Sequence, residues 1–144
     1  MKRALIVVLG VCLIVGGHLR AQSSYEAIHT FGVNPGDGVE PLGRLLQASD
    51  GNVYGVTFFG GDHDLGTIYR VTPDGAVTTI VSFDGVTNGS RPSGGLVQAR
   101  DGALYGTTQR GGALDWGIAF RVTLDGVFTT LADFDIDTTG AQPL

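Results

Sequence analysis

The feature that most constrains the fold is an internal repeat. The stretch 45–83 returns as 96–134, and aligning 42–92 with 93–143 without a gap gives 25 identities in 51 positions. A period of this length is typical of propellers, solenoids and other arrays that use one supersecondary unit again. The sequence therefore predicts two copies of one structural unit, residues 42–92 and residues 93–144.

Each unit reads as four short β-strands. The apolar segments are rich in Val, Ile, Thr, Tyr and Phe and are bounded by turn residues, which is typical of strands. Asp-Gly pairs separate the first strand from the second and the third from the fourth, because Gly supplies the positive φ that a tight hairpin needs. The predicted strands are 45–48, 52–57, 67–72 and 76–83 in the first unit, and 96–99, 103–108, 118–123 and 127–134 in the second.

Alternation along these strands assigns side chains to faces. Tyr69 and Val71 share a face of the third strand, and Val77, Val81 and Phe83 are expected to share a face of the fourth. The opposite faces are also partly apolar, so both sides of each sheet need cover. Face-to-face stacking of four-stranded meanders provides that cover, and the predicted fold is all-β and propeller-like.

Residues 22–41 precede the first unit. Their strand, 24–31, aligns with 76–83 at an offset of 52 residues, so it is predicted to be an orphan fourth strand followed by a loop that ends at Pro41. In a closed propeller such a strand completes the final blade, and two blades are too few for a ring of the usual four to eight. We therefore expect either a fragment of a longer propeller or a homo-oligomer whose copies complete a ring.

Residues 1–21 have the pattern of a secretory signal peptide. Lys2 and Arg3 precede an apolar run of 14 residues, 4–17, and Ala21 offers a cleavage position. The run is short for a membrane span. The expected location is therefore extracellular or at the cell surface, with no membrane attachment after cleavage, and the alternative is an uncleaved N-terminal anchor.

Composition excludes several kinds of partner. Without residues 1–21 the chain keeps six Arg against 14 acidic residues, a formal charge of −8. This charge repels the phosphates of nucleic acids and of anionic membranes, so neither is expected as a partner. The one cysteine, Cys12, lies in the segment that is expected to be removed, so we expect no disulfide and no thiolate metal site.

Residues 43–55, GRLLQASDGNVYG, return in similar form from Gly94 onward, and 66–75 is matched by 117–126. These segments resemble the GloVer tandem repeats of bacterial exported proteins over almost all of 24–144. The resemblance implies a β-propeller-like fold and a cell-surface context, often with many repeats and a C-terminal sorting anchor. With two repeats, this chain is expected to be a fragment. The resemblance implies no catalytic residue and no cofactor.

One loop groups potential metal ligands. Asp62, His63 and Asp64 are adjacent, but only the last of them recurs, as Asp115. A site for a hard metal ion needs several converging oxygens, so a solvated loop is the stronger interpretation. Asp64 and Asp115 are instead expected to accept hydrogen bonds within their own turns.

Aromatic side chains offer a candidate contact surface. Phe58, Phe59 and Trp116 lie in or beside the loops between the second and third strands. Exposed rings could stack on sugars or dock a partner, and they could equally fill the gap between blades. Arg70 and Arg121 recur on the third strand, where each is expected to pair with a neighbouring acid or to lay its stem over a blade edge.

The sequence predicts an exported repeat module that binds or scaffolds an unknown protein or glycan. It has no recurring catalytic constellation, so we do not expect an enzyme. One alternative is part of an exported carbohydrate-active propeller enzyme whose active-site blades are missing. The other is a non-functional remnant of a truncated gene.

Overall fold

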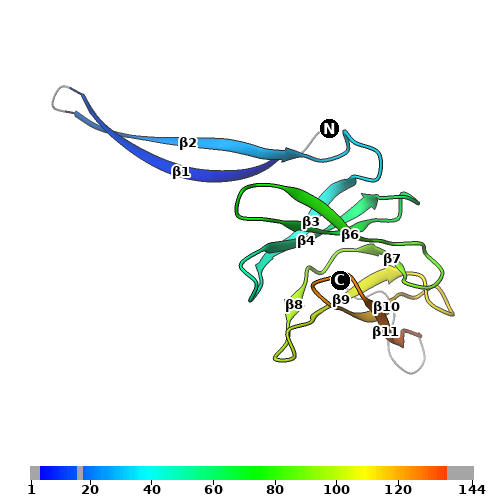
Figure 1. Ribbon diagram of the computed structural model, residues 1–144. Coiled ribbons are helices and arrows are strands. Elements are labelled where there is room, and N and C mark those ends of the chain that lie inside the picture. The colour runs from blue at the N-terminus through cyan, green and yellow to red at the C-terminus, as the bar shows by residue number, and fades with distance from the viewer. Residues whose placement is uncertain (1–3, 16–17, 136–144) are drawn as a thin grey trace.

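The computed structural model describes residues 4–15 and 18–135, and every regular element in that part of the chain is a β-strand. An N-terminal hairpin of β1 (Ala4–Val15) and β2 (His18–Thr30) extends away from two sheets that lie one on the other (Figure 1). The first sheet, blade 1, consists of β3 (Gly38–Gln47), β4 (Val53–Gly60), β5 (Thr67–Val71) and β6 (Val77–Ser82). The second, blade 2, consists of β7 (Ser90–Pro92), β8 (Val97–Gln98), β9 (Leu104–Arg110), β10 (Ile118–Val122) and β11 (Phe128–Asp133).

Both blades are antiparallel meanders with the same strand order. Blade 1 has the order β3-β4-β5-β6, and in blade 2 β7 and β8 both pair with β9, which is followed by β10 and β11. The prediction of an all-β, propeller-like fold with two antiparallel blades in tandem is confirmed.

The Asp-Gly turns form as the repeat predicts. At the first turn the N–H of Gly51 donates to the Ala48 carbonyl at 3.0 Å, and Gly51 has a φ of 83°. The Asp50 carboxylate accepts the Tyr54 hydroxyl at 2.8 Å, and Asp101 accepts Tyr105 at 2.9 Å. A hydrogen bond from the second strand thus holds the same turn in both blades.

The first strand differs from the prediction. β3 begins at Gly38, inside the segment that was expected to be a loop, and its counterpart in blade 2 is divided into β7 and β8. Pro41 lies within β3, opposite Thr57, and not ahead of the strand. An edge strand tolerates proline because its outer N–H needs no ladder partner.

A β-bulge corrects the predicted faces of the fourth strand. Ile68 pairs with Val81, whereas the next residue, Tyr69, pairs with Thr79. The extra residue turns Val81 toward blade 2 together with Ile68, and Val77 packs on the opposite face with Tyr69. The prediction that Val77 and Val81 share a face is therefore wrong.

The strand predicted at 24–31 is longer and is not alone. β2 begins at His18 and pairs with β1 from Val15↔His18 to Ala4↔Thr30. The hairpin includes most of residues 1–21, and the removal of that segment as a signal peptide stays a prediction.

The main core lies between the blades. Tyr54, Phe83, Leu104 and Val122 are fully buried there. The other buried members are Ala48, Val56, Ile68, Val81, Leu96, Ile118 and Phe120.

The same ring contact recurs between successive units. Phe83 follows β6, and its ring meets Phe120 of blade 2 with 5.7 Å between centroids. Phe31 follows β2, and its ring meets Tyr69 of blade 1 at 4.9 Å. Since Tyr69 and Phe120 are repeat counterparts, the end of β2 acts on blade 1 as a preceding blade would.

Candidate functional site

Two of the predicted contact residues form an aromatic cluster at the junction of the blades. The rings of Phe58 and Phe59, at the end of β4, meet edge to face with 4.8 Å between centroids. The guanidinium carbon of Arg91 lies 5.9 Å from the Phe58 centroid and 5.7 Å from that of Phe59. All three side chains are half-buried, so the cluster presents rings and a cation to the surface together.

The backbone holds Arg91 in place. Its φ is 56°, its N–H donates to the Leu65 carbonyl at 2.8 Å, and its neighbours Ser90 and Pro92 are buried. Within the described residues no carboxylate lies within ion-pair distance of its guanidinium. Sequence reasoning missed Arg91 because the end of the first repeat, with β7, joins blade 2, and only the packing of the two blades brings this residue to the rings of blade 1.

The fold does not require this cluster. The counterparts of Phe58 and Phe59 in blade 2 are Gln109 and Arg110, and β9 forms the same strand with them. Rings that a sister blade does without are candidates for a contact outside the chain. We therefore take Phe58, Phe59 and Arg91 as the candidate binding surface.

Trp116, the third predicted contact residue, makes no ring contact with Phe58 or Phe59 among the described residues. It is half-buried in the loop between β9 and β10, where its counterpart in blade 1 is Leu65. Leu65 packs against the main core.

In the loop with Asp62, His63 and Asp64, the last of these residues stabilises the turn itself. Asp64 has a φ of 57° and accepts the N–H of Gly60 at 2.9 Å, and Asp115 repeats this with Gly111 at 2.8 Å. The prediction that these acids serve their own turns is confirmed. In the described part of the chain, no three His, Cys, Asp or Glu side chains gather as a metal site would require.

The two recurring arginines behave differently. Arg121 Nε donates to Asp101 at 3.1 Å, as predicted. Arg70 Nε is buried and has no partner among the described residues. The blade 1 carboxylate, Asp50, is instead bonded to the side-chain amide of Asn52 at 2.8 Å.

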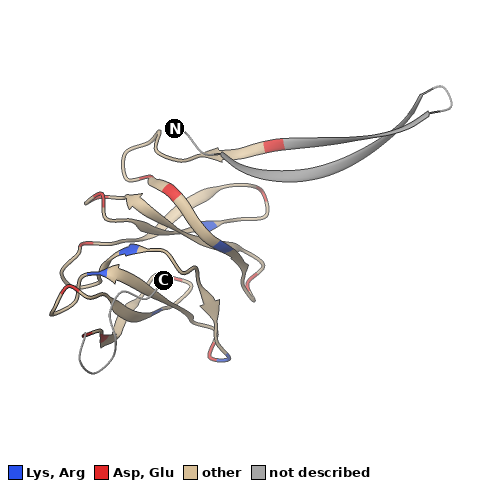
Figure 2. Cartoon of the chain, turned by 180° about the vertical axis from the view of Figure 1, so that it is seen from behind, with Lys and Arg blue, Asp and Glu red and all other residues tan. Residues whose placement is uncertain are grey.

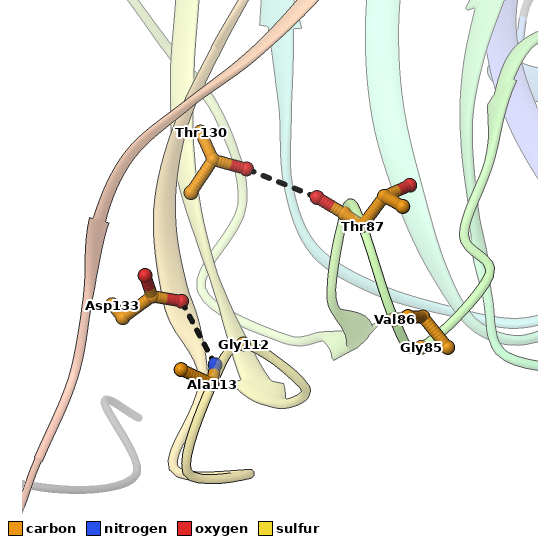
Figure 3. Close-up of a pocket in the computed structure, with 7 residues that line it drawn as sticks. All are labelled: Gly85, Val86, Thr87, Gly112, Ala113, Thr130 and Asp133. Atoms are coloured by element: carbon orange, nitrogen blue, oxygen red, sulfur yellow. Dashed lines mark hydrogen bonds between the residues drawn. The ribbon is translucent and has the colours of Figure 1, made fainter.

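Neighbouring units also enclose a hollow beside the last strand of each blade, and Figure 3 shows the one beside β11 of blade 2. In blade 2 it has a volume of about 580 Å³ between the loop after β6 and strand β11. The Thr130 hydroxyl donates across it to the Thr87 carbonyl at 3.2 Å, and the Ala113 N–H donates to Asp133 at 3.1 Å. Thr79 makes the matching bond to Gly36 at 3.3 Å in blade 1, and these two residues line a hollow there as well.

Asp84 organises the loop beside that hollow. Partial desolvation raises the pKa of its carboxyl, but hydrogen bonds from the Thr87 hydroxyl and from the backbone N–H groups of Val86, Thr87 and Asn88 outweigh it and lower the pKa to about 2. The loop therefore depends on an ionised Asp84.

A pH dependence follows from Asp84. Its pKa in the folded chain lies below the unfolded value of about 3.9, so its stabilisation is complete above about pH 5 and is lost as the pH falls through about 2. Solvent screening limits the effect to about 1 kcal/mol. We expect the wild type to melt a few degrees above Asp84→Asn at pH 6, and thermal unfolding from pH 6 to 2 should show this difference shrinking. A difference that stays constant over that range would contradict the assignment.

The acidic residues lie mainly in the turns and loops, whereas most of the arginines lie on strands. Figure 2 shows acidic residues at the loops of both blades and few basic ones. Within the described residues there is no helix long and apolar enough to span a membrane.

Comparison with known proteins agrees with the repeat architecture. The model of the Gloeobacter/Verrucomicrobia repeat matches residues 18–144. No curated protein and no solved structure matches the chain. The match includes both blades and β2, and it confirms the resemblance to GloVer repeats. The chain therefore belongs to the Gloeobacter/Verrucomicrobia repeat family.

Proposed function

We propose that this protein is an exported or cell-surface repeat module with two roles. It binds an extracellular glycan, and its stacked blades form the scaffold that carries the binding surface. The observation that carries the binding role is the cluster of Phe58, Phe59 and Arg91 at the junction of the blades. The signal-like pattern of residues 1–21 supports export.

The chemistry of the cluster favours a glycan that carries carboxylates. Aromatic faces suit the apolar face of a sugar ring, and a guanidinium offers donors that match a carboxylate. Arg91 keeps those donors free of protein carboxylates in the described residues, although the chain has an excess of acids. On a chain whose excess of acids repels an acidic polysaccharide, Arg91 therefore offers a guanidinium that can bind a carboxylate of the glycan.

Affinity electrophoresis of the full chain tests this function, with polygalacturonate as the acidic probe and dextran as the neutral one. We expect polygalacturonate to retard the protein. Replacing Phe58 and Phe59 together by Ala, or making Arg91→Gln, is expected to weaken the binding about tenfold, which corresponds to about 1.4 kcal/mol.

The matched control is Arg110→Gln, which removes an arginine whose side chain is 41% exposed and lies 3.5 Å from Asp115. It lowers the charge by the same amount, so it should leave the retardation unchanged. If Arg110→Gln and Arg91→Gln weaken binding equally, the attraction is a general charge effect and the cluster is not the site. If no probe retards the wild type, the acidic-glycan function is wrong.

A further inference from the structure

Blade 2 has an apolar face that no part of the described chain covers. We call it the outer face of blade 2, and it lines a hollow of about 350 Å³. Val97 is 65% exposed there and Leu131 is 51% exposed. The face consists of Val97, Tyr105, Thr107, Ala119 and Leu131, and the hollow is also lined by Gly94, Gly95, Gly106 and Phe120.

The corresponding face of blade 1 is closed. Tyr54, Val56 and Ile68 are the repeat counterparts of Tyr105, Thr107 and Ala119, and they are at most 1% exposed. Blade 2 covers them with Leu104, Phe120 and Val122, and with the half-buried Phe128. The same surface is thus the main core of the molecule in one repeat and open to solvent in the next.

The face of blade 2 that packs on blade 1 indicates what kind of surface would fit the outer face of blade 2. It is a blade face with an aromatic residue at the position of Phe120 and aliphatic residues around it. Blade 1 has a second face of this kind, in which Val53, Tyr69, Val71 and Val77 are the counterparts of Leu104, Phe120, Val122 and Phe128. Ile28 and Phe31 pack against that face in this chain.

The outer face of blade 2 has more room than the corresponding face of blade 1. Ala119 and Thr107 are smaller or more polar than their counterparts Ile68 and Val56, which leaves the hollow on the outer face of blade 2. Tyr69 lies over Gly55 of blade 1 as Phe120 lies over Gly106 of blade 2, so the two faces present their central rings in the same way.

We infer that the outer face of blade 2 binds blade 1 of a second copy of this chain, head to tail, in the way that blade 2 binds blade 1 within one chain. In the second copy Ile28 and Phe31 already pack on the blade 1 face that would dock. They act as a cap on this face, and the cap must move aside before the two copies can bind. A head-to-tail contact of this kind builds a ring when its rotation closes and a filament when it does not.

The cap gives the inference two variants with opposite effects. Leu131→Arg places a charge on the docking face and should prevent association. Phe31→Ala removes the main ring of the cap, so it should lower the protein concentration needed for association about tenfold. Leu114→Arg is the matched control, because Leu114 is 61% exposed in the loop between β9 and β10, outside the face.

Sedimentation velocity of the full chain over a wide range of concentration measures these effects. We expect the wild type and Leu114→Arg to associate alike, Phe31→Ala to associate at lower concentration, and Leu131→Arg to stay monomeric. Far-UV circular dichroism of each variant checks that it is folded, and Val97→Lys provides a second charge on the face if Leu131→Arg fails to fold.

Two results would overturn the inference. One is a wild type and a folded Phe31→Ala that both stay monomeric, and the other is a folded Leu131→Arg or Val97→Lys that associates like the wild type. The inference rests on the scaffolding part of the proposed function. Polygalacturonate binding by monomeric Leu131→Arg separates the two proposals, because the ligand cluster does not include Leu131.

Discussion

Replacing Phe83 by Ala is expected to destabilise the protein by about 3–5 kcal/mol, the usual cost of removing a large aromatic side chain from a core. Phe83 is 0% exposed, and its ring contacts Phe120 at 5.7 Å and Phe128 at 6.0 Å. Its removal leaves a cavity between the blades. Because domains have a total stability of about 5–15 kcal/mol, the variant should lose much of its cooperative unfolding transition.

Urea unfolding followed by circular dichroism measures this loss. Val86→Ala is the control, because Val86 is 79% exposed in the loop that follows Phe83 and should change stability by less than about 0.5 kcal/mol. If Phe83→Ala is as stable as Val86→Ala, the blades do not pack on each other through this ring.

Gly117→Ala is expected to destabilise the protein by at least about 3 kcal/mol. Gly117 has a φ of 92°, and a Cβ there would lie 2.1 Å from the carbonyl oxygen of Thr108, in the neighbouring strand β9. Left-handed backbone alone costs a non-glycine residue about 1–2 kcal/mol, and the overlap with Thr108 must also displace a strand of the sheet. Gly66, the counterpart in blade 1, has the same problem at 2.5 Å from the Thr57 carbonyl.

Gly102→Ala separates the two causes. Gly102 has a φ of 79°, but a Cβ there would meet no atom within 4 Å. It should therefore cost only the backbone term, about 1–2 kcal/mol, in the same urea experiment. Equal costs at Gly102 and Gly117 would show that the close approach of Gly117 to β9 is not present in solution.

The repeat and the turn residues were enough to predict the meander. Gly51 and Gly102 mark hairpins because their φ is positive, and this requirement is local. Alignment of 24–31 with 76–83 predicted that Phe31 would correspond to Phe83, and the structure places both rings against the same position of successive blades. The alignment therefore predicts which rings take equivalent places in successive units, and the apolar faces of the strands predict that these units stack.

The parts that were missed depend on contacts that alternation does not encode. The bulge between Thr79 and Val81 adds one residue to the strand, so the side chains after it point to the opposite face from the one that alternation predicts. The local sequence of this bulge does not differ from that of a regular strand. The early start of β3 depends on its pairing with β4 as far as Gly60. Arg91 joined the candidate site only because β7 belongs to blade 2, and the stacking of the two blades brings it over Phe58 and Phe59.

The central claim is that successive repeats pack face to face through the ring that follows each fourth strand. The most direct measurement is a nuclear Overhauser spectrum of the full chain with labelled phenylalanine rings. The account predicts cross-peaks between the ring protons of Phe83 and Phe120, whose centroids lie 5.7 Å apart. A spectrum in which the assigned Phe83 ring shows cross-peaks to blade 1 alone would contradict it.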